Sequence, residues 1–154
     1  MELQPIIDRL NAKNYAQNSG LSAFEETNLT EAEKVFIQTY QPQQSLIIYG
    51  SLAPGRPNHS KVEMIKGTWK QGTVSGKLVS EGWGAELGYN GFVPAFDHGQ
   101  IQIPAYILFS NELEFYLPML DEFEGNGYQR ILTAFVQEDG KAGVGNIYAL
   151  NTES

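Results

Sequence analysis

From residue 45 onwards the chain is divided into short apolar runs separated by glycine and proline, and this pattern limits the folds open to it. The runs are SLIIY, TVSGKLVS, GFVPAF, IQIPAYILF and the two within ILTAFVQEDGKAGVGNIYAL, which flank the common hairpin turn Asp139-Gly140. One helical stretch, SNELEFYLPMLDEFEG, interrupts the series. Five or six short strands with one internal helix predict an α+β fold, a small mixed β-barrel with flanking helices.

The first part of the chain has helical periodicity instead. Apolar residues recur three to four positions apart over residues 3–10, which is the spacing of one helix face. Thr30 and Glu33 form a capping-box pattern ahead of a second apolar face. Because amphipathic terminal helices commonly dock on their own domain, we expect residues 1–44 to form a two-helix extension that packs on a barrel domain of residues 45–154. The alternative is an arm that contacts another protein.

Composition excludes several classes of partner and chemistry. The 154 residues carry a formal net charge of −8, which argues against nucleic acid and anionic membrane surfaces as partners. The absence of cysteine excludes disulfides and thiolate chemistry. His59 and His98 are too few and too isolated for a metal site. The first ten residues, MELQPIIDRL, lack the pattern of a signal peptide, so we expect a cytoplasmic protein.

A carboxylate lies on the apolar stripe of the internal helix. At 100° per residue, Leu117 and Leu120 share a face with Glu124, whereas Asp121 and Glu122 point away from it. Burying an ionised carboxylate is costly, so the pKa of Glu124 should rise and suit it to proton exchange near neutral pH. The alternative is a helix that ends early and leaves Glu124 in solvent.

The loop after the first strand, in LIIYGSLAPGRPNH, contains a possible anion site. Consecutive N–H groups at residues 50–52 would form an anion-binding nest, although an ordinary turn also fits the sequence. Ser51 is not in a nucleophile elbow, because Tyr49 occupies the position of the required first glycine. A catalytic arrangement of Ser51, His59 and Asp97 remains a distant third possibility.

Two segments, YGSLAPGRPNH and LDEFEGNGYQR, lie about seventy residues apart and together resemble the γ-glutamylcyclotransferase-like family. More narrowly they are similar to its γ-glutamylamine cyclotransferase (AIG2-like) branch, over roughly residues 45–150. The resemblance implies a small β-barrel with a cavity at its mouth and a small-molecule γ-glutamyl substrate. The α-amine of that substrate attacks its own γ-carbonyl, which releases an amine or amino acid and forms 5-oxoproline. The resemblance implies neither a cofactor nor a metal.

The same resemblance implies roles for individual residues. The loop that binds the γ-glutamyl carboxylate matches Tyr49, Gly50, Ser51 and Leu52. The catalytic glutamate of the family matches Glu124, Tyr128 matches a tyrosine of the pocket wall, and Tyr148 is a weaker match to another. One partly desolvated carboxylate can serve first as general base and then as general acid. The competing hypothesis is a non-catalytic protein that binds a small ligand or a partner and retains the barrel cavity. The sequence leaves the leaving amine and the oligomeric state open.

Overall fold

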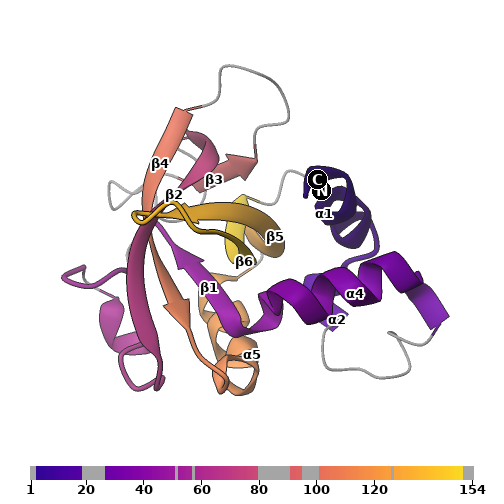
Figure 1. The fold of residues 1–154 in the computed structure, drawn as a ribbon. Coiled ribbons are helices and arrows are strands. Elements are labelled where there is room, and N and C mark those ends of the chain that lie inside the picture. Colours follow the sequence, from indigo (N-terminus) through magenta and orange to yellow (C-terminus); the bar gives the residue numbers. More distant parts are fainter. Residues whose placement is uncertain are drawn as a thin grey trace.

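The computed structural model describes residues 3–18, 27–50, 52–56, 58–79, 91–94, 101–125 and 127–150. Its helices are α1 (Gln4–Ala12), α2 (Tyr15–Asn18), α4 (Glu31–Tyr40) and α5 (Leu113–Glu124), with the 3-10 turns η1 (Pro42–Gln44) and η2 (His59–Lys61) (Figure 1). Its strands are β1 (Ser45–Ile48), β2 (Thr68–Val79), β3 (Gly91–Pro94), β4 (Ile101–Phe109), β5 (Tyr128–Gln137) and β6 (Ala142–Leu150). No helix in these ranges is long and apolar enough to cross a membrane.

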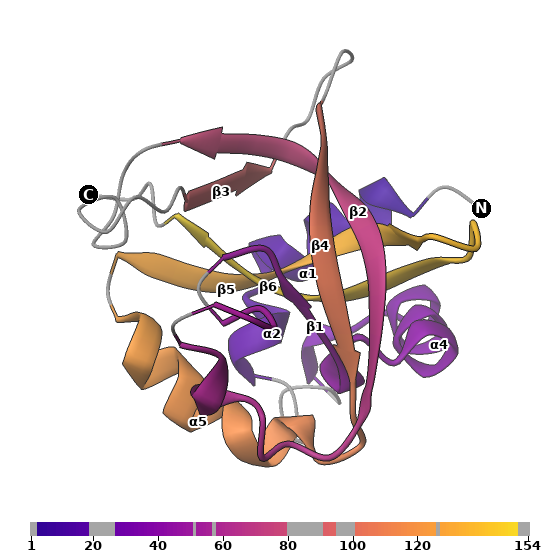
Figure 2. The ribbon, with the colours of Figure 1, turned by 90° about the vertical axis from the view of Figure 1, so that its left-hand side faces the viewer.

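Five strands close into a mixed barrel. β1, β4, β2, β5 and β6 pair in that order, and β6 pairs back to β1. β3 lies outside this ring and pairs with β2 and β6 (Figure 2). β6 runs parallel to β1 and β3, whereas the other pairings are antiparallel. The predicted α+β class and the small mixed barrel with flanking helices are therefore confirmed.

The two faces of β1 belong to two different cores. Ile47 packs inside the barrel with residues such as Ile107 and Ile147, and all three are at most 1% exposed. Leu46 and Ile48 point the opposite way, as alternate residues of a strand must, and pack against α5 and the segment that follows β1. A strand buried on both faces needs a continuous apolar run, which explains the sequence of β1.

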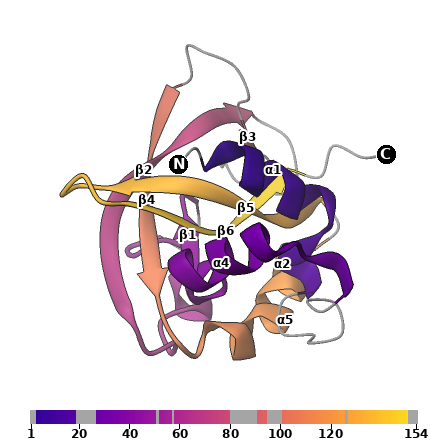
Figure 3. The same cartoon turned by 45° about the vertical axis from the view of Figure 1, so that its right-hand side comes forward.

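The N-terminal helices cover the outer face of β5 and β6 (Figure 3). Apolar residues of α1, α2 and α4 form a third core with Leu132 of β5 and Val144 of β6. The Asn11 side chain connects α1 to β5 through two hydrogen bonds. Its Nδ2 donates to the Leu132 carbonyl at 2.9 Å, and its Oδ1 accepts from the Leu132 N–H at 2.9 Å. The predicted capping box at α4 is present, with Glu33 N–H donating to Thr30 Oγ1 and Thr30 N–H to Glu33 Oε1.

The structure differs from the sequence prediction at two places. The first helical stretch is split into α1 and α2, because Asn14 adopts a left-handed backbone (φ +57°) that stops α1. β2 begins at Thr68, five residues before the predicted run. That early part is not an apolar run, and its pairing with β4, from Thr68 opposite Phe109 onwards, holds it in the sheet.

Candidate active site

The strand order brings the predicted site residues to one end of the barrel. β1 and β6 are parallel, with Ile47 opposite Ile147, so their carboxyl ends meet at the same edge. β5 runs antiparallel to β6 and begins at this edge, with Tyr128 opposite Leu150. α5 ends just before β5 begins, and so delivers Glu124 to the same end. Segments that are distant in the sequence therefore converge here.

Glu124 is the last residue of α5 and follows its buried stripe of Leu113, Leu117 and Leu120. Gly125 ends the helix with a φ of +76°, a conformation that favours glycine. Burial raises the pKa of the half-buried Glu124 carboxyl to about 7, and the negative charge of Asp121 adds to the rise. At neutral pH, Glu124 is therefore able both to take up and to release a proton.

The charge of Glu124 acts on two tyrosines, Tyr49 and Tyr148. Burial raises the pKa of Tyr49, and the charges of Glu124 and Tyr128 raise it further. Burial likewise raises the pKa of Tyr148, together with the charge of Asp121, the hydrogen bond to Asp121 and the charge of Glu124. Tyr49, Tyr128 and Tyr148 thus lie close enough to Glu124, or to one another, to share one electrostatic environment.

The hydroxyl of Tyr49 connects three strands. It donates to the Tyr148 carbonyl of β6 at 2.7 Å and accepts from the Phe92 N–H of β3 at 2.9 Å. The ring of Tyr49 packs against that of Phe92, with 5.8 Å between the ring centroids. Tyr49 follows β1 directly, so its side chain ties the end of β1 to two neighbouring strands. This structural contribution was not part of the sequence prediction.

The loop after Tyr49 is held by a hydrogen bond within the loop, by a buried side chain and by a contact with His59. The Gly50 carbonyl accepts from the Ala53 N–H at 3.1 Å, and the Leu52 side chain is buried in the core beneath α5. The Leu52 carbonyl lies 2.9 Å from Nδ1 of His59. A side chain at position 50 would meet open space, because no atom of the described residues beyond the chain neighbours lies within 4 Å of where its Cβ would be.

Some predicted residues lie outside the described part of the chain. Ser51, Asp97 and His98 belong to this group, so the structure gives no placement for the Ser51–His59–Asp97 arrangement. Within the described ranges, no three His, Asp or Glu side chains are grouped so that they could hold a metal ion.

A partly buried ion-pair network lies beside Glu124, and the sequence analysis missed it. Arg130 is 6% exposed, and its Nε and Nη2 donate to the two carboxylate oxygens of Asp121 at 2.8 and 3.1 Å. The Tyr148 hydroxyl donates to the same carboxylate at 2.6 Å. Nη1 of Arg130 donates to the Asn146 side chain at 2.9 Å and to the Ala16 carbonyl at 2.7 Å. Asp121 and Arg130 both stand in LDEFEGNGYQR, but the sequence does not show that they pair.

A cavity of about 820 Å³ opens beside this network. Its walls come from the turn between α1 and α2, from α2 itself, from the end of α5, from the start of β5, and from β6. The lining residues are Asn14, Gln17, Asn18, Asp121, Glu122, Gly125, Tyr128, Gln129, Arg130 and Tyr148. The cavity therefore shares two of its tyrosines with the surroundings of Glu124.

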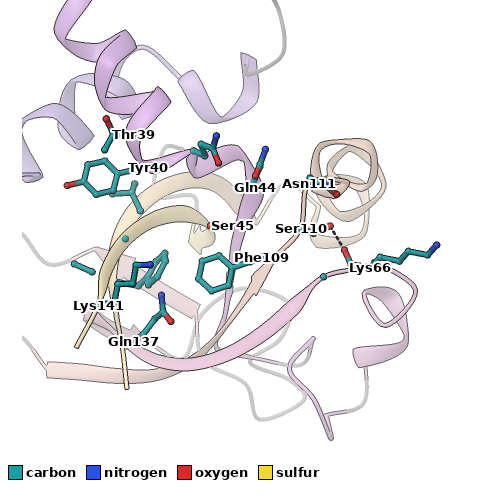
Figure 4. A pocket seen from close by; sticks show the side chains of 16 residues that line it. Thr39, Tyr40, Gln44, Ser45, Lys66, Phe109, Ser110, Asn111, Gln137 and Lys141 are labelled. Atoms are coloured by element: carbon teal, nitrogen blue, oxygen red, sulfur yellow. Dashed lines mark hydrogen bonds between the residues drawn. The ribbon is translucent and has the colours of Figure 1, made fainter. Parts of the chain in front are cut away.

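A second cavity, of about 580 Å³, lies between the end of α4, the end of β4 and the β5–β6 hairpin (Figure 4). Its described lining residues include no carboxylate. Lys66 is one of the lining residues, and its side chain extends away from the cavity in Figure 4. Its carbonyl accepts a hydrogen bond from Ser110 Oγ. The cavity beside Arg130 thus differs from this one in having Asp121 and Glu122 in its wall.

Solved structures share the fold at low sequence identity. YkqA from Bacillus subtilis is 21% identical with a TM-score of 0.55, and the match covers 70% of this chain but only 36% of YkqA. An AIG2-like protein from Mus musculus is 22% identical with a TM-score of 0.50, covering 72% of this chain and 79% of that protein. An Arabidopsis thaliana protein is 20% identical with a TM-score of 0.50, and the match covers 72% of this chain and 70% of that protein. No curated protein sequence matches the chain.

The family is shown by a sequence model. Residues 46–154 match the model of the family described as gamma-glutamyl cyclotransferase, AIG2-like. This range contains the whole barrel apart from the first residue of β1, together with α5 and the end of the barrel where Glu124 lies. It leaves α1, α2 and α4 outside. The resemblance seen in the sequence is thereby confirmed, and the chain belongs to the AIG2-like gamma-glutamyl cyclotransferase family.

Proposed function

We propose that the chain releases an amine or amino acid from a γ-glutamyl compound by forming 5-oxoproline, with Glu124 as the catalytic residue. The observation that carries the proposal is the position of Glu124, a half-buried carboxyl with a pKa of about 7 at the barrel end where the Tyr49 loop begins. Membership of the AIG2-like family supports a cyclotransferase-type activity in general.

The reaction needs two proton transfers, and one carboxyl can perform both. Glu124 in its ionised form takes a proton from the α-ammonium of the substrate, and the resulting amine attacks the γ-carbonyl carbon. A C–N bond forms and closes the ring. Glu124 then returns the proton to the amide nitrogen and the old C–N bond breaks. The ring nitrogen still carries one proton more than the lactam keeps, and the released amine takes up that proton, so the products are 5-oxoproline and an ammonium ion. A carboxyl whose pKa lies near the working pH is best suited to this double role.

The loop after β1 would hold the substrate for this attack. Backbone N–H groups at residues 50–52 would bind the α-carboxylate, while Tyr128 would form part of the pocket wall. The open space beside Gly50 leaves room for a ligand. Fixing the carboxylate there would bring amine and carbonyl together, which is the main advantage of an intramolecular reaction.

A panel of γ-glutamyl amines and γ-glutamyl amino acids tests the proposal, with products identified by mass. The wild-type protein should release 5-oxoproline from at least one compound. Glu124→Gln keeps the shape of the side chain but cannot carry the proton, so kcat should fall by roughly 10²–10⁴-fold. Glu114→Gln is the matched control, because Glu114 is exposed near the opposite end of the same helix.

Two outcomes would contradict the proposal. If Glu124→Gln and the wild type turn over at the same rate, Glu124 is not the proton carrier. If γ-glutamyl compounds bind but none is converted, the non-catalytic binding protein becomes the better description of this chain.

A further inference from the structure

The cavity beside Arg130 borders the proposed reaction centre at the end of α5. With the α-carboxylate at the loop and the α-amine at Glu124, the substituent on the amide nitrogen has to leave the reaction centre in another direction. The lining residues of the cavity include Gly125, the residue after Glu124, together with Tyr128 and Tyr148. The cavity therefore borders the proposed reaction centre, although neither Glu124 nor the described residues of the loop 50–52 line it.

One wall of this cavity comes from outside the family match. Asn14 lies in the turn between α1 and α2, and Gln17 and Asn18 belong to α2, whereas the family model begins at residue 46. Two hydrogen bonds fix α2 on the barrel: Gln17 Nε2 donates to the Arg130 carbonyl, and Arg130 Nη1 donates to the Ala16 carbonyl. The N-terminal helices thus supply three polar side chains in a fixed position.

The described lining residues of the cavity carry more negative than positive charge, which favours a cationic ligand. Asp121 and Glu122 contribute two carboxylates, and Arg130 is the one cation among the described lining residues. All three Arg130 nitrogens already donate to groups of the chain itself. The carbonyl end of α5, which carries a partial negative charge, also faces this region through Gly125.

A leaving group with a carboxylate would therefore meet two like charges in the described wall, and the one cation there, Arg130, is already paired with Asp121 and donates four hydrogen bonds within the chain. A leaving group with a second ammonium would be attracted to Glu122 and to the end of α5. Amide side chains such as Asn14 and Gln17 carry oxygens that accept hydrogen bonds from an ammonium.

We propose that the cavity between the α1–α2 turn and α5 is a leaving-group subsite that prefers an amine bearing a second ammonium over one bearing a carboxylate. This inference rests on the proposed function. It assigns to the N-terminal helices a role in substrate selection, and it makes Glu122, Gln17 and Asn14 specificity-determining residues rather than catalytic ones.

Three γ-glutamyl compounds of matched length test the preference. Their leaving groups are a four-carbon monoamine, a four-carbon diamine and a four-carbon amino acid with a terminal carboxylate. The diamine derivative should have the highest kcat/KM and the carboxylate derivative the lowest, with about tenfold between neighbours, because unit charges in a partly desolvated site interact appreciably. Added salt should narrow the differences.

Two variants test the residues. Glu122→Gln should lower the preference for the diamine over the monoamine, whereas Glu114→Gln removes the same charge outside the cavity and should not. Gln17→Lys places a cation in the wall contributed by α2 and should raise kcat/KM for the carboxylate derivative about tenfold. Gln4→Lys, an exposed position in α1 away from the cavity, is its control for net charge.

A binding measurement separates the two proposals. Each of the three compounds is titrated into ¹⁵N-labelled protein, and the side-chain amide signals of Asn14 and Gln17 are followed. Turnover of all three at equal kcat/KM would overturn the subsite and leave the cyclotransferase activity standing. Tighter binding of the diamine derivative, with shifts at these amides but no 5-oxoproline, would support the subsite and overturn the proposed activity. No shift at these amides with any compound would overturn the subsite whatever the turnover.

Discussion

At the scale of single residues, Glu124 is held in a position that favours its neutral form. The pKa of about 7 lies above the ordinary value of 4.5, so the folded protein binds the Glu124 proton more tightly than the unfolded chain does. The stability supplied by protonated Glu124 is complete below about pH 4.5 and is lost as the pH rises through about 7. A group kept near its pKa for catalysis thus lowers the stability of the fold at neutral and alkaline pH.

Glu124→Gln should therefore stabilise the protein in a pH-dependent way. The free energy of unfolding of Glu124→Gln minus that of the wild type should grow by about 3 kcal/mol from about pH 4 to about pH 8, because glutamine has no charge to bury. Urea unfolding at the two pH values measures the difference. Glu114→Gln should show no such increase, and a Glu124→Gln difference that is the same at both pH values would contradict the raised pKa.

Asp121, one helical turn before Glu124, adds to the rise in the pKa of Glu124 that burial causes. Asp121→Asn removes the like charge and leaves Arg130 as an unbalanced cation, and both changes lower the pKa of Glu124. The acidic limb of the kcat/KM profile should move to lower pH. The ¹³C chemical shift of the Glu124 carboxyl, followed against pH, reports the same change without turnover. A limb that stays in place or moves to higher pH would exclude this role for Asp121.

At the scale of elements, the Tyr49 side chain connects the end of β1 to two neighbouring strands. Its hydroxyl joins β1 to β3 and β6, two strands that come much later in the chain. The strand pairing of β3 with β6 is short, with one described pair between Phe92 and Ala149. The hydroxyl of Tyr49 therefore adds connections where the sheet has few of its own.

Tyr49→Phe should destabilise the protein by about 1–3 kcal/mol, because it leaves the Phe92 N–H without its acceptor. Thermal or urea unfolding measures the loss, and hydrogen exchange at Phe92 should become faster. Tyr106→Phe, another half-buried tyrosine whose ring contacts Trp69, is the control and should have a smaller effect. An unchanged stability would show that the hydroxyl does not hold these strands together.

At the scale of the whole molecule, Arg130 joins three layers. It belongs to β5 and bonds to Asp121 of α5, Asn146 of β6 and Ala16 of α2. The N-terminal helices, the barrel and the helix that carries Glu124 are therefore connected through one guanidinium group. Lysine would not replace it, since a single ammonium lacks the planar set of donors.

Arg130→Met should lower the free energy of unfolding by about 3 kcal/mol, because Asp121 loses its partner and several acceptors lose their donor. The estimate lies at the low end for a buried pair, since the Asp121 side chain is 40% exposed. Arg56→Met, at an exposed position, should change stability by less than about 0.5 kcal/mol. Equal effects of the two substitutions would show that the Arg130 network contributes little.

The sequence alone determined the features that depend on neighbouring residues. The capping box at Thr30, the hairpin at Asp139-Gly140 and the phase of Glu124 on its helix follow from spacings of one to four residues. The family resemblance likewise rests on two short segments. Such features are fixed by the periods of helix and strand, which the sequence displays directly.

Only the tertiary structure decided which distant residues meet. The parallel pairing of β1 with β6 closes the barrel. The antiparallel register of β5 with β6 places Arg130 opposite Tyr148, and both side chains bond to Asp121 of α5. The turn at Asn14 splits the first helix and sets α2 against β5, so that Ala16 meets Arg130. These contacts depend on strand order and register over a hundred residues of chain, and side-chain periodicity carries no information about either.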